Sequence, residues 1–337
     1  MSRLIQTRSE LTESNQLHEM TENSTSRLLV LDYPEHWGMF YINNNRLTIC
    51  KALKKESLAD TIIMARVDNV KKDLGAAFVK LDEKTTAFLK LTNIPDRFEP
   101  VHQGNLIPVR LLSDEQKGKR IAVTANISEK KLPLGWQHKT AYSILKKPDN
   151  SLSAYIKKTF HRICIAKILT DNTEIYNDLK DSLDNVELYS DEKLSLAKLY
   201  SLKTKIKEAN ESKIYLKCGG YLVINHTEAL TVIDVNSGKN VISRKADNEA
   251  NILNINLQAA KESALIMKLR NITGMILIDF INMNEETSNE ALINAMQEEV
   301  NDDYVTVKVI DITPLGIMEI TRQKIDKPLS EYINIFM

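Results

Sequence analysis

Two aspartates end strand-like runs in the last third of the chain, and an asparagine follows one of them. LTVIDVN carries Asp234 and Asn236, and MILIDF carries Asp279. A helix between the two runs would let them pair as neighbouring strands, with both carboxylates at the same edge of a sheet. Two carboxylates and an amide oxygen are the hard donors that magnesium prefers, with water and a phosphate oxygen in its remaining positions. The alternative is a plain turn, because Asp-x-Asn before Ser237-Gly238 is good turn sequence.

Aromatic and basic side chains elsewhere could contact a nucleic acid. Phe78 in GAAFVKL and Phe88 in TAFLKL lie on successive strand-like runs, and Lys117 and Lys119 belong to the basic run QKGKR. Exposed rings stack on unpaired bases, whereas buried rings fill a core. A basic run can follow phosphates or form a solvated loop. The residues alone leave both alternatives open.

Four further basic residues lie near the acidic runs in sequence: Lys239, Arg244, Arg270 and Arg322. An arginine there could hold a phosphate with two hydrogen bonds, or pair with a surface carboxylate.

The elements that must position these residues fall into three regions. Five short strand-like runs separated by polar turns, from Ser57 to about Ile127, predict a small closed β-barrel. Apolar residues at three and four spacing predict helices within Gln137–Asn210. Beyond that point strand-like runs alternate with helical ones, including a long helix over Glu249–Arg270, which is typical of an α/β domain. Before the barrel, two β-like runs are expected, the second folding back at residues 43–45.

Bulk properties fit an ordinary globular protein. The 337 residues are 43% hydrophobic and 27% charged with a net charge of zero, which predicts two or three domains and no basic surplus. Cys50, Cys164 and Cys218 are far apart, so neither a disulfide framework nor a structural zinc site is expected. No signal peptide or apolar run of membrane-spanning length is found. We therefore expect a cytoplasmic protein without a membrane span.

Read together, these stretches resemble the ribonuclease E/G family of endoribonucleases. The resemblance is continuous from about Leu216 to Lys324, through GGYLVINHTEALTVIDVNSGK, GMILIDFINM and TPLGIMEITRQK. A weaker one covers ADTIIMARVDNVKKDLGAAFVKLDEKTTAFLKLTNI, which is similar to the family's S1 domain. The resemblance implies a magnesium site at Asp234, Asn236 and Asp279, with manganese as a substitute, and catalytic roles for the two aspartates.

The resemblance also implies contacts with single-stranded RNA, made by Phe78, Phe88, Lys117, Lys119, Lys239, Arg270 and Arg322. The implied reaction is magnesium-dependent hydrolysis that leaves a 5′-phosphate and a 3′-hydroxyl, in RNA processing or decay. The rival hypothesis is an RNA-binding protein that keeps the architecture without turnover.

Three departures from the family pattern modify these expectations. The segment after the barrel is short and offers no counterpart of the Arg-Thr pair that holds a 5′-monophosphate, so we expect no 5′-end sensing of the usual kind. The sequence stops at PLSEYINIFM without a C-P-x-C element, so no zinc-linked tetramer is expected, and a dimer through the catalytic domain or a monomer stays open. Asn282 and Gln258 replace acidic residues of the family pattern.

The predicted fold class is α+β and multidomain. It combines an S1 (oligonucleotide-binding) β-barrel, a helical linker region and an α/β catalytic domain of the DNase I-like type. The predicted domains are a mobile tail (1–26), a β-hairpin segment packing with a remnant ribonuclease H-like region (27–56), the RNA-binding barrel (57–127), a shortened helical region (128–213) and the catalytic domain (214–337).

Overall fold

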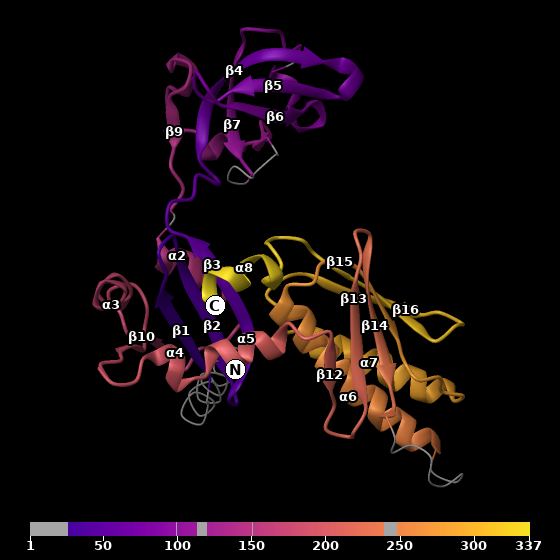
Figure 1. Cartoon of the computed structure of the whole chain (residues 1–337). Coiled ribbons are helices and arrows are strands. Elements are labelled where there is room, and N and C mark those ends of the chain that lie inside the picture. Colours follow the sequence, from indigo (N-terminus) through magenta and orange to yellow (C-terminus); the bar gives the residue numbers. More distant parts are fainter. Residues whose placement is uncertain (1–25, 99, 113–119, 150, 239–247) are drawn as a thin grey trace, which may run out of the picture. The chain divides into compact units, whose positions relative to one another are not determined.

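The computed structural model describes residues 26–98, 100–112, 120–149, 151–238 and 248–337. The tail predicted over 1–26 lies outside these ranges except for its last residue. The chain divides into two compact units, Lys55–Ser151 and a larger unit made of Met1–Lys54 with Leu152–Met337 (Figure 1). In the described part of the chain, no helix has the length and apolar character needed to cross a membrane.

Five strands of the smaller unit close into the predicted barrel. They are β4 (Ile62–Lys71), β5 (Ala76–Lys80), β6 (Thr86–Lys90), β7 (Leu106–Leu111) and β8 (Ala122–Thr124). The order β5-β6-β8-β7-β4 is closed by a β5–β4 pairing, with β6 and β8 parallel and the other barrel neighbours antiparallel. Alternate residues such as Ala77, Val79 and Leu89 fill its core. The predicted strands are confirmed, because period-two alternation matches the pleat of each strand.

The segment after the barrel folds with it, so the helical region predicted from residue 128 is wrong at its start. This segment holds the short turns η4 (Glu129–Lys131) and η5 (Trp136–His138) and the strand β9 (Ile144–Lys146). β9 pairs with β4, and Trp136 and Leu145 pack near Ile62. Elements of three residues are too short to carry a readable period.

The first sheet of the larger unit joins strands that are far apart in sequence. Its order is β11-β10-β1-β2-β3, from the strands β1 (Arg27–Asp32), β2 (His36–Asn43), β3 (Arg46–Lys54), β10 (Lys167–Thr170) and β11 (Val186–Leu188). The predicted fold-back is confirmed, because Asn44 and Asn45 take φ values of 47° and 61°, as a two-residue hairpin turn requires.

Short helices accompany this sheet, but the helical region is less helical than predicted. They are α2 (Leu152–Thr159), α3 (Thr173–Lys180), α4 (Leu196–Leu199), α5 (Leu202–Ala209) and α8 (Leu329–Phe336). Within the region predicted to be helical, α2 ends at Thr159. The apolar residues that follow it enter β10, which pairs in parallel with β1.

The second sheet of the larger unit is mixed and carries the predicted acidic residues. Its strands are β12 (Lys213–Tyr215), β13 (Tyr221–His226), β14 (Leu230–Asn236), β15 (Gly274–Asp279), β16 (Val307–Ile312) and β17 (Ile317–Arg322). Their order is β12-β13-β14-β15-β17-β16. α6 (Asn248–Arg270) connects β14 to β15, and α7 (Glu286–Val300) connects β15 to β16. The predicted alternation is confirmed, and β12 and β17 are strands that the sequence analysis did not predict.

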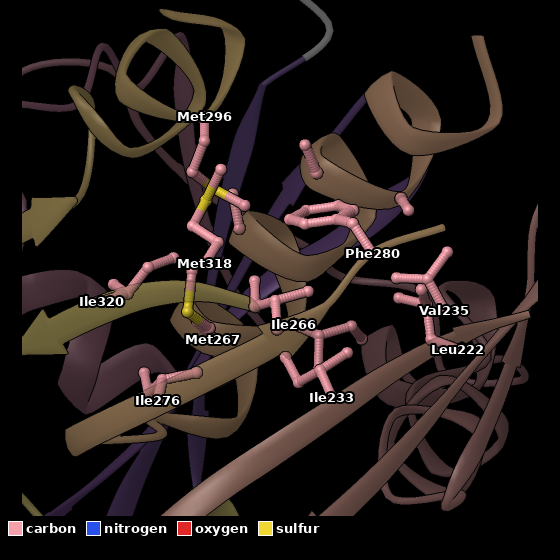
Figure 2. Packing of buried hydrophobic residues seen from close by; sticks show 14 of the residues in the cluster. Leu222, Ile233, Val235, Ile266, Met267, Ile276, Phe280, Met296, Met318 and Ile320 are labelled. Atoms are coloured by element: carbon pink, nitrogen blue, oxygen red, sulfur yellow. The ribbon is translucent and has the colours of Figure 1, made fainter. Parts of the chain in front are cut away.

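One face of this sheet packs on α6 and α7. Figure 2 shows Ile233 and Val235 of β14, Ile276 of β15 and Met318 of β17 among side chains from the helices, such as Met267. Because side chains alternate along a strand, the remaining residues point away from this core. We call the opposite face, with its partly or fully exposed side chains, the outer face of the sheet.

Candidate functional site

Asp234 and Asp279 lie opposite each other at the ends of two parallel strands. They are register partners in the last rung between β14 and β15. Their neighbours Ile233, Val235 and Ile278 belong to the helix-packed core, so both carboxylates project from the outer face. Neighbouring strands are about 4.8 Å apart, which brings the two side chains together. The expectation that a strand–helix–strand unit joins these two residues is confirmed.

Asn236 lies on the same face, two residues beyond Asp234. Its Nδ2 donates a hydrogen bond of 2.7 Å to Asp234 Oδ2. A half-turn of the carboxamide would present its oxygen instead. Asp234 and Asn236 therefore lie close enough to act on one ligand.

The backbone beside Asn236 is packed so closely that two glycines are required. A Cβ atom on Gly220 would lie 2.7 Å from the carbonyl oxygen of Asn236, and one on Gly238 would lie 2.3 Å from that of Gly219. Gly238 also has a φ of 70°, which side chains disfavour. The Gly-Gly and Ser-Gly pairs in the sequence therefore fix the chain around the end of β14.

A buried asparagine that the sequence analysis missed holds the chain after β15. Asn256 on α6 is fully buried; its Nδ2 donates to the carbonyl of Ile281 at 2.8 Å, and its Oδ1 accepts from Ile281 N at 3.1 Å. This pair of bonds fixes the backbone two residues beyond Asp279. A polar residue within the apolar pattern of a long helix was the available signal.

The residues that depart from the family pattern lie around the same sheet edge. Gln258 Oε1 accepts a hydrogen bond of 3.1 Å from Cys218 N, which ties α6 to the turn between β12 and β13. Asn282 lines a cavity of about 600 Å³ together with Glu286, Asp311 and other residues of α7 and the β16–β17 turn.

Neither aspartate has a cationic partner within the described ranges. Among the residues that the structure describes, no Lys, Arg or His lies within ion-pair distance of Asp234 or Asp279. The same part of the chain contains no group of three or more His, Cys, Asp and Glu side chains that could hold a metal. The candidate donor set is thus two carboxylates and one amide, on a face open to solvent.

Arg322 does not lie at this site, which corrects its predicted role in RNA binding. It is 2% exposed; Nε and Nη2 donate to both carboxylate oxygens of Asp303 at 2.9 and 3.0 Å, and Nη1 donates to Asn271 Oδ1 at 2.7 Å. Its register partner is Gly274, at the far end of β15 from Asp279. Gly274 and Asp279 are five residues apart on β15, so the backbone beside Arg322 lies about 17 Å from that of Asp279. Arg322 is therefore a buried structural residue.

Arg270 also lies away from the carboxylates. It is the last residue of α6, which begins after the end of β14 and returns to the start of β15. A helix of 23 residues is about 34 Å long, so the two ends of α6 lie at opposite edges of the sheet. Its guanidinium donates to the carbonyl of Glu211, and burial lowers the pKa of Arg270 to about 10, against the opposing charge of Glu211. A direct contact of Arg270 with RNA at the carboxylates is thus contradicted.

Phe78 and Phe88 point outward from the barrel. They are register partners on β5 and β6, half-buried, with ring centroids 6.1 Å apart and planes at 66°. The exposed Arg120 lies with its guanidinium carbon 4.8 Å from the centre of the Phe78 ring. The alternative that these rings fill the barrel core is therefore wrong. The predicted RNA contacts Lys117, Lys119 and Lys239 lie outside the described residues.

The fold thus combines a closed five-stranded barrel with a mixed sheet in which two neighbouring strands end in aspartates. The model of the Ribonuclease E/G family matches residues 115–325, well over half of the chain. The chain belongs to the ribonuclease E/G family.

Individual relatives match shorter segments. Ribonuclease G of Salmonella typhimurium (strain SL1344) is 38% identical over 126 residues, which are 37% of this chain and 25% of that protein. Ribonuclease G of Haemophilus influenzae is 31% identical over 190 residues, or 54% of this chain and 38% of that protein. Ribonuclease E of Escherichia coli (strain K12) is 36% identical over 132 residues, or 39% of this chain and 12% of that protein. The matched segments span at most 38% of the length of these relatives.

Proposed function

We propose that this chain is a magnesium-dependent endoribonuclease that hydrolyses single-stranded RNA, leaving a 5′-phosphate and a 3′-hydroxyl, in RNA processing or decay. The observation that carries the proposal is the pair Asp234 and Asp279, which face each other on adjacent strands without a cation in the described part of the chain. Family membership supports it, because the relatives are named ribonucleases.

Two facing carboxylates destabilise a sheet unless something offsets their charge. Like charges directly opposite on neighbouring strands are unfavourable. If the two carboxylates served only stability, a lysine or arginine would be expected between them. Among the described residues, none forms an ion pair with Asp234 or Asp279. A divalent cation offsets both charges and binds oxygen donors of this kind. The residues present therefore fit magnesium, with manganese as a substitute.

The proposed mechanism assigns a separate task to each residue. Asp234 and Asp279 would hold the ion, and the amide oxygen of Asn236 would complete the protein ligands. The chemistry supplied by a bound magnesium ion would be polarisation of the scissile phosphate and activation of a water. The hydrogen bond from Asn236 keeps the Asp234 carboxylate oriented before the ion binds. Asn256 positions Asp279 through the backbone of Ile281.

The barrel supplies the binding surface in this proposal. Phe78 and Phe88 stack on unpaired bases, and Arg120 beside Phe78 binds the RNA backbone. Affinity should fall steeply with added salt, because phosphate contacts release counterions.

Finer assignments of fold and location belong to the same proposal. We assign the carboxylate-bearing sheet with α6 and α7 to a DNase I-like catalytic domain and the barrel to an S1 domain. The strand pairing and the family support both. We place the protein in the cytoplasm, where RNA is available.

The test is cleavage of a short AU-rich single-stranded RNA by the natural protein and by Asp234→Asn and Asp279→Asn, with and without magnesium. The matched control is Glu319→Gln, which removes an exposed acid of the outer face that lies opposite Leu277, two residues before Asp279 on β15. We expect magnesium-dependent cutting that both aspartate variants lose and the control keeps, while all four proteins bind the RNA.

Two outcomes would contradict this proposal. Cutting that persists in Asp234→Asn and Asp279→Asn would remove the carboxylates from the mechanism. Binding without any cutting by the natural protein would replace the hydrolase with the rival, a non-catalytic RNA-binding protein.

A further inference from the structure

A lysine and two tyrosines form a cluster on the outer face, beside the carboxylates. Lys213 and Tyr215 lie on β12 and Tyr221 on β13. The ammonium of Lys213 lies 3.6 Å from the centre of the Tyr221 ring and 5.0 Å from that of Tyr215. The two rings have centroids 6.1 Å apart and planes at 57°. Tyr215 is 72% exposed, so one ring is free for contact.

The strand register connects this cluster with the candidate metal ligands. Lys213 pairs with Val223, which pairs with Asp234, so the lysine and the aspartate lie in one row across the sheet. Tyr215 pairs with Tyr221, and Tyr221 pairs with Asn236, in the next row on the same face. With about 4.8 Å between strands, the Cα atoms of Lys213 and Asp234 are about 10 Å apart. An RNA chain bound at the two carboxylates would therefore extend directly to the lysine–tyrosine cluster.

The chemistry of the cluster fits a nucleotide better than it fits a structural role. No carboxylate among the described residues forms an ion pair with Lys213, so its charge is available to a phosphate. The cation–π contacts hold the ammonium on the outer face, beside the rings. An aromatic face with an adjacent cation is the combination that binds single-stranded nucleic acid without sequence preference.

We propose that Lys213, Tyr215 and Tyr221 form a subsite that stacks a base and holds the phosphate of a nucleotide adjoining the one cut at Asp234 and Asp279. This inference rests on the proposed function for its substrate. The occupant is single-stranded RNA, because the cluster is continuous with the carboxylate pair and offers it a positive charge.

The test measures equilibrium binding of a short single-stranded RNA without magnesium, over a range of salt concentrations. Tyr215→Leu keeps apolar bulk and removes the aromatic face, so binding should weaken roughly tenfold to a hundredfold with an unchanged salt dependence. Tyr215→Phe should bind like the natural protein. Lys213→Gln should lower the slope of log affinity against log salt by about 0.7, the value for one phosphate contact to a single strand.

A matched control removes a similar lysine–tyrosine contact elsewhere in the same unit. Lys180 lies 5.4 Å from the centre of the Tyr176 ring on α3. Tyr176→Leu and Lys180→Gln should leave affinity and salt slope unchanged. A fluorescent adenine analogue in the RNA adds a direct readout, because its emission falls on stacking, and this quenching should disappear in Tyr215→Leu alone.

The outcomes separate the subsite from the proposed activity. If Tyr215→Leu and Lys213→Gln bind like the natural protein, or change no more than the controls, the subsite is refuted even where the natural protein cuts RNA. If the binding losses appear but the natural protein never cuts, the subsite stands and the proposed hydrolysis fails. Failure of the natural protein to bind any single-stranded RNA would refute both.

Discussion

Replacing Arg322 tests whether this residue serves stability or RNA binding. In the structure its guanidinium donates to both oxygens of Asp303, and both side chains are almost completely buried. Arg322→Gln leaves the Asp303 carboxylate buried without its counter-charge. Breaking a buried pair in this way costs about 3–5 kcal/mol, because the desolvated charge loses its compensation. For domains of 150–250 residues, each kcal/mol lowers Tm by about 2–4 °C. We therefore expect a fall of about 6–20 °C.

The assay must report the larger unit alone. The chain has two tryptophans, with Trp37 in the larger unit and Trp136 in the smaller one. In a Trp136→Phe background, fluorescence during heating follows Trp37 and hence the larger unit. RNA affinity is measured on the same proteins well below the transition. Arg322→Gln should unfold early yet bind RNA normally while folded.

The matched control is Lys308→Gln on β16. Lys308 is exposed and pairs in register with Thr321, next to Arg322, so the variant removes a positive charge from almost the same place. Surface substitutions of this kind change stability by about 0.5 kcal/mol or less. The structural assignment would be refuted if Arg322→Gln unfolded at the natural temperature while its RNA affinity and salt slope fell.

Three further predictions concern the barrel, the buried amide and pH. Phe78→Leu and Phe88→Leu should keep the fold, since both rings point outward, and should weaken RNA binding by about 1–3 kcal/mol each in a titration; unchanged affinity would exclude stacking. Asn256→Ala leaves two backbone groups of the loop after β15 without their hydrogen bonds. The free energy of unfolding should fall by about 1–3 kcal/mol per group, which lowers the urea midpoint; an unchanged midpoint would contradict the role of Asn256 in holding this loop. Burial acts to raise the pKa of Asp326, but the Lys51 ammonium 2.8 Å away and the hydrogen bonds donated by Tyr332 Oη and Lys327 N together outweigh it and hold that pKa below its unfolded value. This stabilisation is complete above about pH 4 and is lost as pH falls through the folded pKa. The stability deficit of Lys51→Met should therefore shrink on acidification, and a deficit that grew would contradict the sign.

Patterns with a clear period were read correctly from the sequence. The five barrel strands and α6 have continuous alternation or long helical spacing. The acid-ended runs flank one helix, so β14 and β15 were expected to be neighbours, as they are. The face on which Phe78 lies followed only from the structure, because alternation tells which residues share a face and not which face is inside.

The part of the larger unit that follows α2 was predicted less well, for a physical reason. β10 has four residues, and its apolar side chains continue the spacing of α2, so local pattern cannot separate strand from helix. Its conformation is decided by parallel pairing with β1, which lies far away in sequence, before the barrel. Long-range pairing overrides local preference here.

The buried pair at the far end of the sheet also bears on the carboxylates. β17 lies against β15 with Arg322 opposite Gly274 and Ile317 opposite Asp279. A slip of one residue in such a pairing turns every side chain of a strand to the other face. The two hydrogen bonds between Arg322 and Asp303 favour a single register of β17, because a slip would leave a buried charge without its partner. A residue about 17 Å from Asp279 thus helps to fix how β17 lies against β15, the strand that carries this carboxylate, without touching a substrate.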